Sequence, residues 1–102
     1  SQVIAPDGKT WFFDDNGCMA AWLSDKPFQD EVIIWVKELP TDEWIDGKVA
    51  WYSRMDQTPM SYGFGAYRAY REDLIAFTVM QQAMLKGETM ANLSYRAQLQ
   101  EK

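Results

Sequence analysis

The sequence predicts an α+β fold in which two ββαβ-like units pack into one small domain. The chain has 102 residues, a length that suits a single hydrophobic core. Apolar runs of strand length alternate with stretches of helical spacing, which is typical of mixed folds. The two halves also resemble each other weakly, since an Ala-Trp pair ending at Trp22 corresponds to an Ala-Phe pair ending at Phe77. We therefore expect one domain over residues 1–102, with internal halves at about 1–39 and 44–102.

The first half is expected to begin with a β-hairpin. Residues 2–5 and 10–13 are short apolar runs. Asp7-Gly8 lies between them, and Asp-Gly flanked by two such runs is a strong hairpin signal.

A helix is expected directly after this hairpin. Residues 14–16 offer side-chain oxygens that can cap a helix, and the apolar residues behind them recur at helical spacing as far as Leu23. Lys26-Pro27 ends this helix, because the residue before a proline avoids the helical conformation. Residues 32–36 form a continuous apolar run rich in β-branched side chains, which predicts a buried strand.

The second half is expected to repeat this pattern. Residues 48–54 and 62–70 alternate well enough to form strands, and the polar segment 55–61 between them is expected to be a loop. The longest helix is expected from residue 71 to about residue 86, where Gly87 is a natural C-terminal cap. For the ambiguous tail that follows, we favour a short strand.

Composition excludes several classes of function. The chain carries 10 basic and 15 acidic residues, so its net charge of −5 disfavours nucleic acid and anionic membrane surfaces as partners. It has no histidine, which removes the base of hydrolytic triads and the commonest zinc ligand. Its single cysteine excludes a disulfide within the chain. Six methionines and this cysteine are the soft donors, so a bound transition metal is expected to be copper(I) rather than zinc.

Cys18 and Met60 are the strongest candidate ligands. Cys18 lies in the first turn of the expected first helix, where the helix N-terminus lowers the pKa of a thiol but Asp14 and Asp15 raise it. Burial as a small hydrophobic residue is an equally good interpretation of Cys18. Met60 lies in a polar, proline-containing loop, where it has no evident packing role. Met55, earlier in the same loop, is a weaker candidate that would support the same site.

The other methionines are better explained by packing. Met19 fits the apolar stripe of the first helix, and Met80 and Met84 share the apolar face of the long one. The same explanation competes for Met60, because methionine commonly fills gaps in cores. Met90 lies in the ambiguous tail and predicts nothing.

Three segments, taken in order, resemble one protein family. Residues 13–19 read F-D-D-N-G-C-M, residues 44–52 read W-I-D-G-K-V-A-W-Y, and residues 58–67 read T-P-M-S-Y-G-F-G-A-Y. These segments are similar to the F-D-x-x-G-C-M, W-I-D-A … A-x-Y and T-P-M-G-x-G-x-A-F stretches of the NosL family. The similarity runs from about Val3 to about Leu85.

NosL proteins are periplasmic copper(I)-binding lipoproteins that act as accessory factors of nitrous oxide reductase. They pass copper to a membrane transporter and onward to the copper centres of the enzyme. The resemblance implies a fold of two ββαβ units, and it places Met60 at a copper-ligand position and Cys18 at the cysteine of G-C-M. Family members begin with a lipidated cysteine and carry an upstream Cys-Gly-Met, both of which would fall before Ser1. Ser61 stands where the family has a glycine.

We therefore expect a copper(I) metallochaperone in the periplasm rather than an enzyme, with Met60, Cys18 and Met55 as metal ligands. The expected partners are the copper ion, a membrane transporter and a copper-enzyme acceptor. A membrane would be contacted only through a lipid anchor upstream of Ser1.

Two alternative functions stay open. The chain would be a single-thiol enzyme if Cys18 acted as a nucleophile with Asp14 or Asp15 as the proton carrier. It would be a metal-free interaction module if its aromatic surface docked a partner protein.

Overall fold

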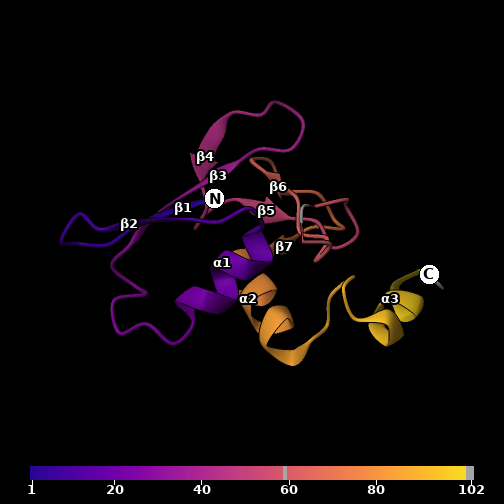
Figure 1. Cartoon of the computed structure of the whole chain (residues 1–102). Coiled ribbons are helices and arrows are strands. Elements are labelled where there is room, and N and C mark those ends of the chain that lie inside the picture. The colour runs from indigo at the N-terminus through magenta and orange to yellow at the C-terminus, as the bar shows by residue number, and fades with distance from the viewer. Residues whose placement is uncertain (59, 101–102) are drawn as a thin grey trace.

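The computed structural model describes residues 1–58 and 60–100, and within them short strands form two antiparallel sheets (Figure 1). The first sheet has the order β2-β1-β3-β4, with β1 at Gln2–Ile4, β2 at Thr10–Phe12, β3 at Ile33–Lys37 and β4 at Trp44–Asp46. The second has the order β6-β5-β7, with β5 at Trp51–Tyr52, β6 at Ala66–Tyr67 and β7 at Ile75–Ala76. This arrangement confirms the α+β class.

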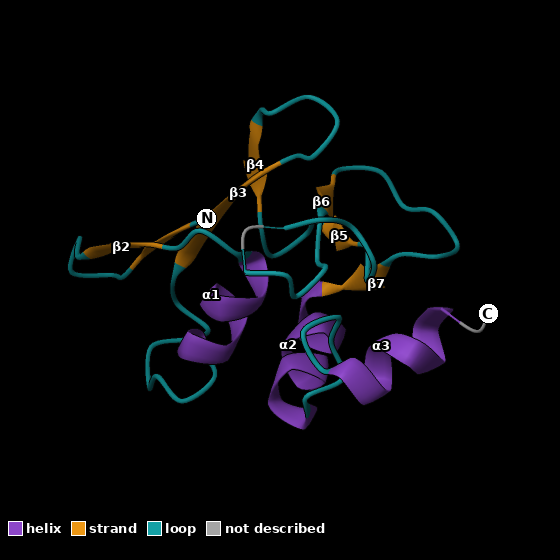
Figure 2. Ribbon diagram, turned by 45° about the vertical axis from the view of Figure 1, so that its right-hand side comes forward, coloured by secondary structure: helices purple, strands orange, loops and turns teal. Residues whose placement is uncertain are grey.

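Helices cover one side of these sheets. Helix α1 (Asn16–Leu23) packs against α2 (Phe77–Lys86), and the two are neighbours in both views (Figures 1 and 2). Helix α3 (Leu93–Gln100) lies to the side, next to the C-terminus. None of the helices in the described residues is long and apolar enough to cross a membrane.

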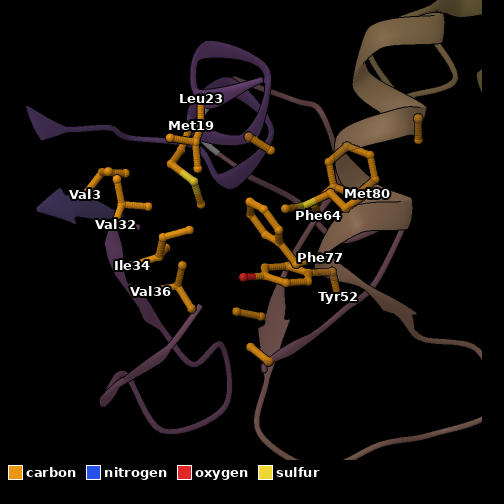
Figure 3. Close-up of a cluster of buried hydrophobic side chains, with 14 residues drawn as sticks. Val3, Met19, Leu23, Val32, Ile34, Val36, Tyr52, Phe64, Phe77 and Met80 are labelled. Atoms are coloured by element: carbon orange, nitrogen blue, oxygen red, sulfur yellow. The ribbon is translucent and has the colours of Figure 1, made fainter. Parts of the chain in front are cut away.

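The hairpin, the first helix and the third strand lie where the sequence predicts them. Gly8 closes the turn between β1 and β2 with φ 89°, a conformation that favours glycine. Val3 pairs with Trp11 on β2 and with Ile34 on β3. Val3 and Ile34 are buried with Met19 of α1, and so the first sheet packs its inner face on this helix (Figure 3).

The strands of the second half are shorter than expected. The strand expected at 48–54 is restricted to β5, and the one expected at 62–70 is restricted to β6. Strand β4 was not anticipated, and it extends the first sheet by pairing with β3. The first half thus has the order ββαβ, whereas α2 follows β5, β6 and β7 in the second half.

The helical part of the second half also differs from the expectation. The helix predicted to start at residue 71 begins at Phe77, because Ile75 and Ala76 are held in an extended conformation by pairing with β5. The tail forms α3 instead of a strand. Its start is capped by Asn92, whose Oδ1 accepts hydrogen bonds from the backbone N–H groups of Ser94 and Tyr95 at 3.1 and 3.3 Å.

Buried residues from both halves form one core. Tyr52, Phe64 and Met80 are fully buried and pack with the side chains from β1, β3 and α1 (Figure 3). The two sheets are also joined directly, since the backbone N–H of Leu39 donates to the carbonyl oxygen of Ala66 over 2.8 Å. The loop between β5 and β6, which carries the candidate site, also contacts the start of α1, where Nδ2 of Asn16 donates to the carbonyl oxygen of Phe64 over 3.0 Å.

Candidate functional site

Asp15 is the residue around which the candidate site is built. It caps α1 in an extended conformation, with φ −132°, and its Oδ1 accepts a hydrogen bond from the backbone N–H of Gly17 over 2.9 Å. Only 2% of Asp15 is exposed. A carboxylate is costly to bury unless its oxygens are hydrogen-bonded, so the partners of the other oxygen matter.

That other oxygen, Oδ2, binds the loop between β5 and β6. It accepts one hydrogen bond from the hydroxyl of Thr58 over 2.6 Å and another from the backbone N–H of Met60 over 3.1 Å. The Thr58 Oγ1 atom also accepts from the backbone N–H of Gly63 over 3.1 Å. The loop is thus fastened to the start of α1.

The loop turns sharply after Met60. The backbone N–H of Ser61 donates to the carbonyl oxygen of Thr58 over 2.9 Å, and Ser61 has φ 62°. This left-handed conformation favours glycine. It therefore gives a physical reason for a glycine at this position in sequences that share the turn. Pro59, which the sequence analysis used to fix the loop, lies outside the described residues.

Cys18 lies half-buried in the first turn of α1. Burial raises the pKa of its thiol, and the negative charge of Asp15 raises it further; a hydrogen bond with the Tyr62 hydroxyl acts in the opposite direction, and Asp14 adds a smaller increase. The effect of Asp14 and Asp15 that the sequence predicts is therefore in the same direction as the net shift of the Cys18 pKa. At neutral pH the free site therefore holds a thiol, whose proton must leave before a metal is bound.

Met60 and Met55 have similar exposure but different surroundings. Met60 is 51% exposed and is attached through its own backbone to Asp15. Met55 is 53% exposed and lines an open hollow of about 370 Å³, and Thr58 and Met90 line the same hollow. The structure thus links Met60 to the start of α1, where Cys18 lies, and places Met55 in a neighbouring hollow.

Met84 and Tyr62 are two site neighbours that the sequence analysis did not anticipate. A Cβ atom added at Gly17 would lie 2.7 Å from Sδ of Met84 and 3.1 Å from Cβ of Tyr62. The thioether of Met84 is therefore packed against the turn that bears Cys18. Helical spacing in the sequence predicts that Met84 lies on the apolar face of α2. It does not predict the contact of Met84 with Gly17.

The chain start is also next to this site. A hollow of about 200 Å³ is lined by Ser1, Asp14, Asp15 and Thr58, among others. The amino group of Ser1 donates to the carbonyl oxygen of Phe13 over 2.6 Å. Ser1 therefore lies beside both segments that meet at Asp15.

The donor set of the site is soft. Within residues 1–58 and 60–100, no three Cys, Asp or Glu side chains are grouped closely enough to hold a metal ion. The sulfur-bearing residues of the two segments that Asp15 joins are Cys18 on α1 and Met60 on the loop, and thiolate and thioether are soft ligands. Comparison of the chain with family models, curated proteins and solved structures found no match.

Proposed function

We propose that the chain is a periplasmic copper(I) metallochaperone of the NosL type, which carries the ion as cargo rather than as a catalytic centre. The observation that carries this proposal is the attachment of the Met60 loop to the capped start of α1 by Asp15. This attachment brings the backbone of Met60, whose side chain is half exposed, to the start of the helix whose first turn bears Cys18. Few and accessible soft ligands suit a protein that must release its metal to a partner.

The alternative of a single-thiol enzyme receives less support from the same geometry. A nucleophilic cysteine usually has a lowered pKa, because the thiolate is the reactive form. The pKa of Cys18 is instead raised by burial and by Asp15. Asp15 already accepts three hydrogen bonds from Gly17, Thr58 and Met60, so it is engaged in holding the loop rather than placed to carry a proton.

The position of Ser1 is consistent with further ligands from an upstream segment. Any residue that preceded Ser1 would start beside Asp14 and Thr58. A Cys-Gly-Met in such a segment would have a high local concentration at the Met60 loop, and its sulfurs would strengthen copper(I) binding without new contacts to the domain. We propose that a membrane transporter and a copper enzyme then receive the ion.

The test is an anaerobic titration with copper(I) and with zinc, each in competition with a chelator. We expect copper(I) to be bound in preference to zinc, and we expect Cys18→Ser and Met60→Ala to weaken it. Met55→Ala is the matched comparison for Met60→Ala, because the two side chains are equally exposed. A smaller loss for Met55→Ala is expected. Tighter binding of zinc would contradict the proposal, and absence of copper(I) binding would favour the metal-free interaction module.

A further inference from the structure

We infer that Asp15 is a positioning residue which holds the Met60 loop against the start of α1, so that the sulfurs of Met60 and Cys18 can reach one copper(I) ion. This inference rests on the proposed function, and it adds Asp15 as a residue that does not bind the metal itself.

Each oxygen of the Asp15 carboxylate accepts hydrogen bonds from a different one of the two segments that carry the proposed ligands. Oδ1 accepts from the backbone N–H of Gly17, the residue directly before Cys18, over 2.9 Å. Oδ2 accepts from the backbone N–H of Met60 itself over 3.1 Å and from the hydroxyl of Thr58 over 2.6 Å. One side chain thus fixes how far apart the two segments lie.

Helix capping alone does not explain a carboxylate at this position. Serine or asparagine would satisfy the backbone N–H of Gly17 about as well. A buried carboxylate is costly unless it is fully hydrogen-bonded, and Asp15 is 2% exposed. Hydrogen bonds to an ionised acceptor are the stronger kind, and two of those that Asp15 receives come from the loop. Its second oxygen is therefore used to hold the loop.

Groups that hold a metal ligand in place have a measurable effect on metal affinity. Loss of such an outer partner typically costs about 10–100-fold in affinity. Removal of the Asp15 carboxylate would release the backbone of Met60. The entropy cost of ordering the loop again when the metal binds would then lower the affinity. This loss of copper(I) affinity should depend on the presence of Met60, and it should occur although the ligands themselves are unchanged.

The experiment compares Asp15→Asn and Asp15→Ser with Asp14→Asn. Both Asp15 variants keep a capping oxygen for α1, but neither provides the charged acceptor of the loop. Asp14 is exposed and adjacent, and the hydrogen bonds of Thr58 and Met60 go to Asp15, so Asp14→Asn makes the same change of charge and leaves those hydrogen bonds in place. We expect copper(I) affinity to fall about 10–100-fold in the Asp15 variants and to change little in Asp14→Asn. An equal fall in Asp14→Asn would overturn the inference, because charge alone would then explain the effect.

A double-mutant cycle separates positioning from a general structural role. In a Met60→Ala background, Asp15→Asn should cause no further loss of copper(I) affinity if Asp15 acts through Met60. Independent, additive losses would overturn the inference. Amide hydrogen exchange without metal provides a second readout: the Met60 N–H should exchange faster in both Asp15 variants than in Asp14→Asn. Unchanged exchange would also overturn it.

The two proposals fail in different ways. If Met60→Ala binds copper(I) as tightly as the parent chain, the proposed function fails and the inference fails with it. If Met60→Ala weakens binding while both Asp15 variants bind normally, only the role of Asp15 is wrong. Should Asp15→Asn not fold, Thr58→Val removes one donor to the same Oδ2 and retains Asp15, and it should show the same direction of change in Met60 exchange and in affinity. Normal exchange and affinity in Thr58→Val would then overturn the inference.

Discussion

The hydroxyl of Thr58 donates a hydrogen bond to Oδ2 of Asp15 over 2.6 Å, although the two residues are 43 positions apart in the chain. The same Thr58 oxygen accepts from the backbone N–H of Gly63 and so closes the loop on itself. This pair joins the first half of the chain to the second outside the hydrophobic core. The loop therefore has a fixed place while both of its methionines, Met55 and Met60, stay half exposed.

Thr58→Val should destabilise the protein. The substitution keeps the shape of the side chain but leaves a buried carboxylate oxygen and the Gly63 N–H with one partner fewer, which costs about 1–3 kcal/mol. Urea-induced unfolding measures this loss. Thr78→Val, at an exposed position of α2, is the control and should change the free energy of unfolding by less than about 0.5 kcal/mol. Equal stability of the two variants would show that the hydrogen bond to Asp15 contributes nothing.

Met60 and Met80 should respond in opposite ways to truncation. Met80 is fully buried in the core, so Met80→Ala should cost about 2–5 kcal/mol of unfolding free energy and leave copper(I) affinity almost unchanged. Met60 is half exposed, so Met60→Ala should cost little stability and weaken copper(I) binding. Unfolding curves and chelator competition measure the two effects. If Met60→Ala destabilises as much as Met80→Ala and binds copper(I) normally, Met60 is a packing residue.

Ser61→Gly should stabilise the loop. Ser61 has φ 62°, a conformation that costs a residue with a Cβ atom roughly 1 kcal/mol and costs glycine almost nothing. Part of this gain is lost to the greater freedom of glycine in the unfolded chain. Ser24→Gly is the contrasting variant, because Ser24 has φ −59° and its hydroxyl donates to the carbonyl oxygen of Ala21, so glycine should destabilise there. Thermal unfolding of both variants measures this difference: the melting temperature should rise in Ser61→Gly and fall in Ser24→Gly.

Copper(I) affinity should depend on pH through Cys18. Burial and the charge of Asp15 raise the pKa of this thiol above its ordinary value, so the thiol is protonated at neutral pH. Copper(I) must displace that proton, and apparent affinity should rise by about tenfold per pH unit until the raised pKa is reached. Chelator competition at several pH values measures the slope. Cys18→Ser should abolish the slope; an unchanged slope in that variant would exclude the thiol as a ligand.

Local sequence signals were sufficient for the first half of the fold and insufficient for the second. The Asp7-Gly8 turn and the β-branched run of β3 are strong because they act within a few residues. Ile75 and Ala76 form a strand only because β5 lies beside them, and no pattern within residues 71–86 marks that pairing. The two-residue strands β5 to β7 are too short to show a period.

The same distinction applies to the candidate site. Asp15 could be recognised as a helix cap, because a cap and its helix are adjacent in sequence. Its hydrogen bonds to Thr58 and Met60 could not be recognised, because they depend on how the two halves dock. The contact of Met84 with Gly17 is hidden for the same reason. Composition shows which sulfur-bearing side chains the chain contains, whereas their arrangement depends on the docking of the two halves.

The most direct test is methyl NMR of the protein labelled at the methionine methyl groups, recorded during an anaerobic copper(I) titration. The six methionines act as internal controls, since Met19 and Met80 are buried in the core while Met60 and Met55 are exposed. Substitution of single methionines assigns each signal. We expect the Met60 signal to shift with one equivalent of copper(I), with Met19 and Met80 unmoved. A Met60 signal that stays in place while another methionine responds, or no response at all, would contradict the proposed copper site.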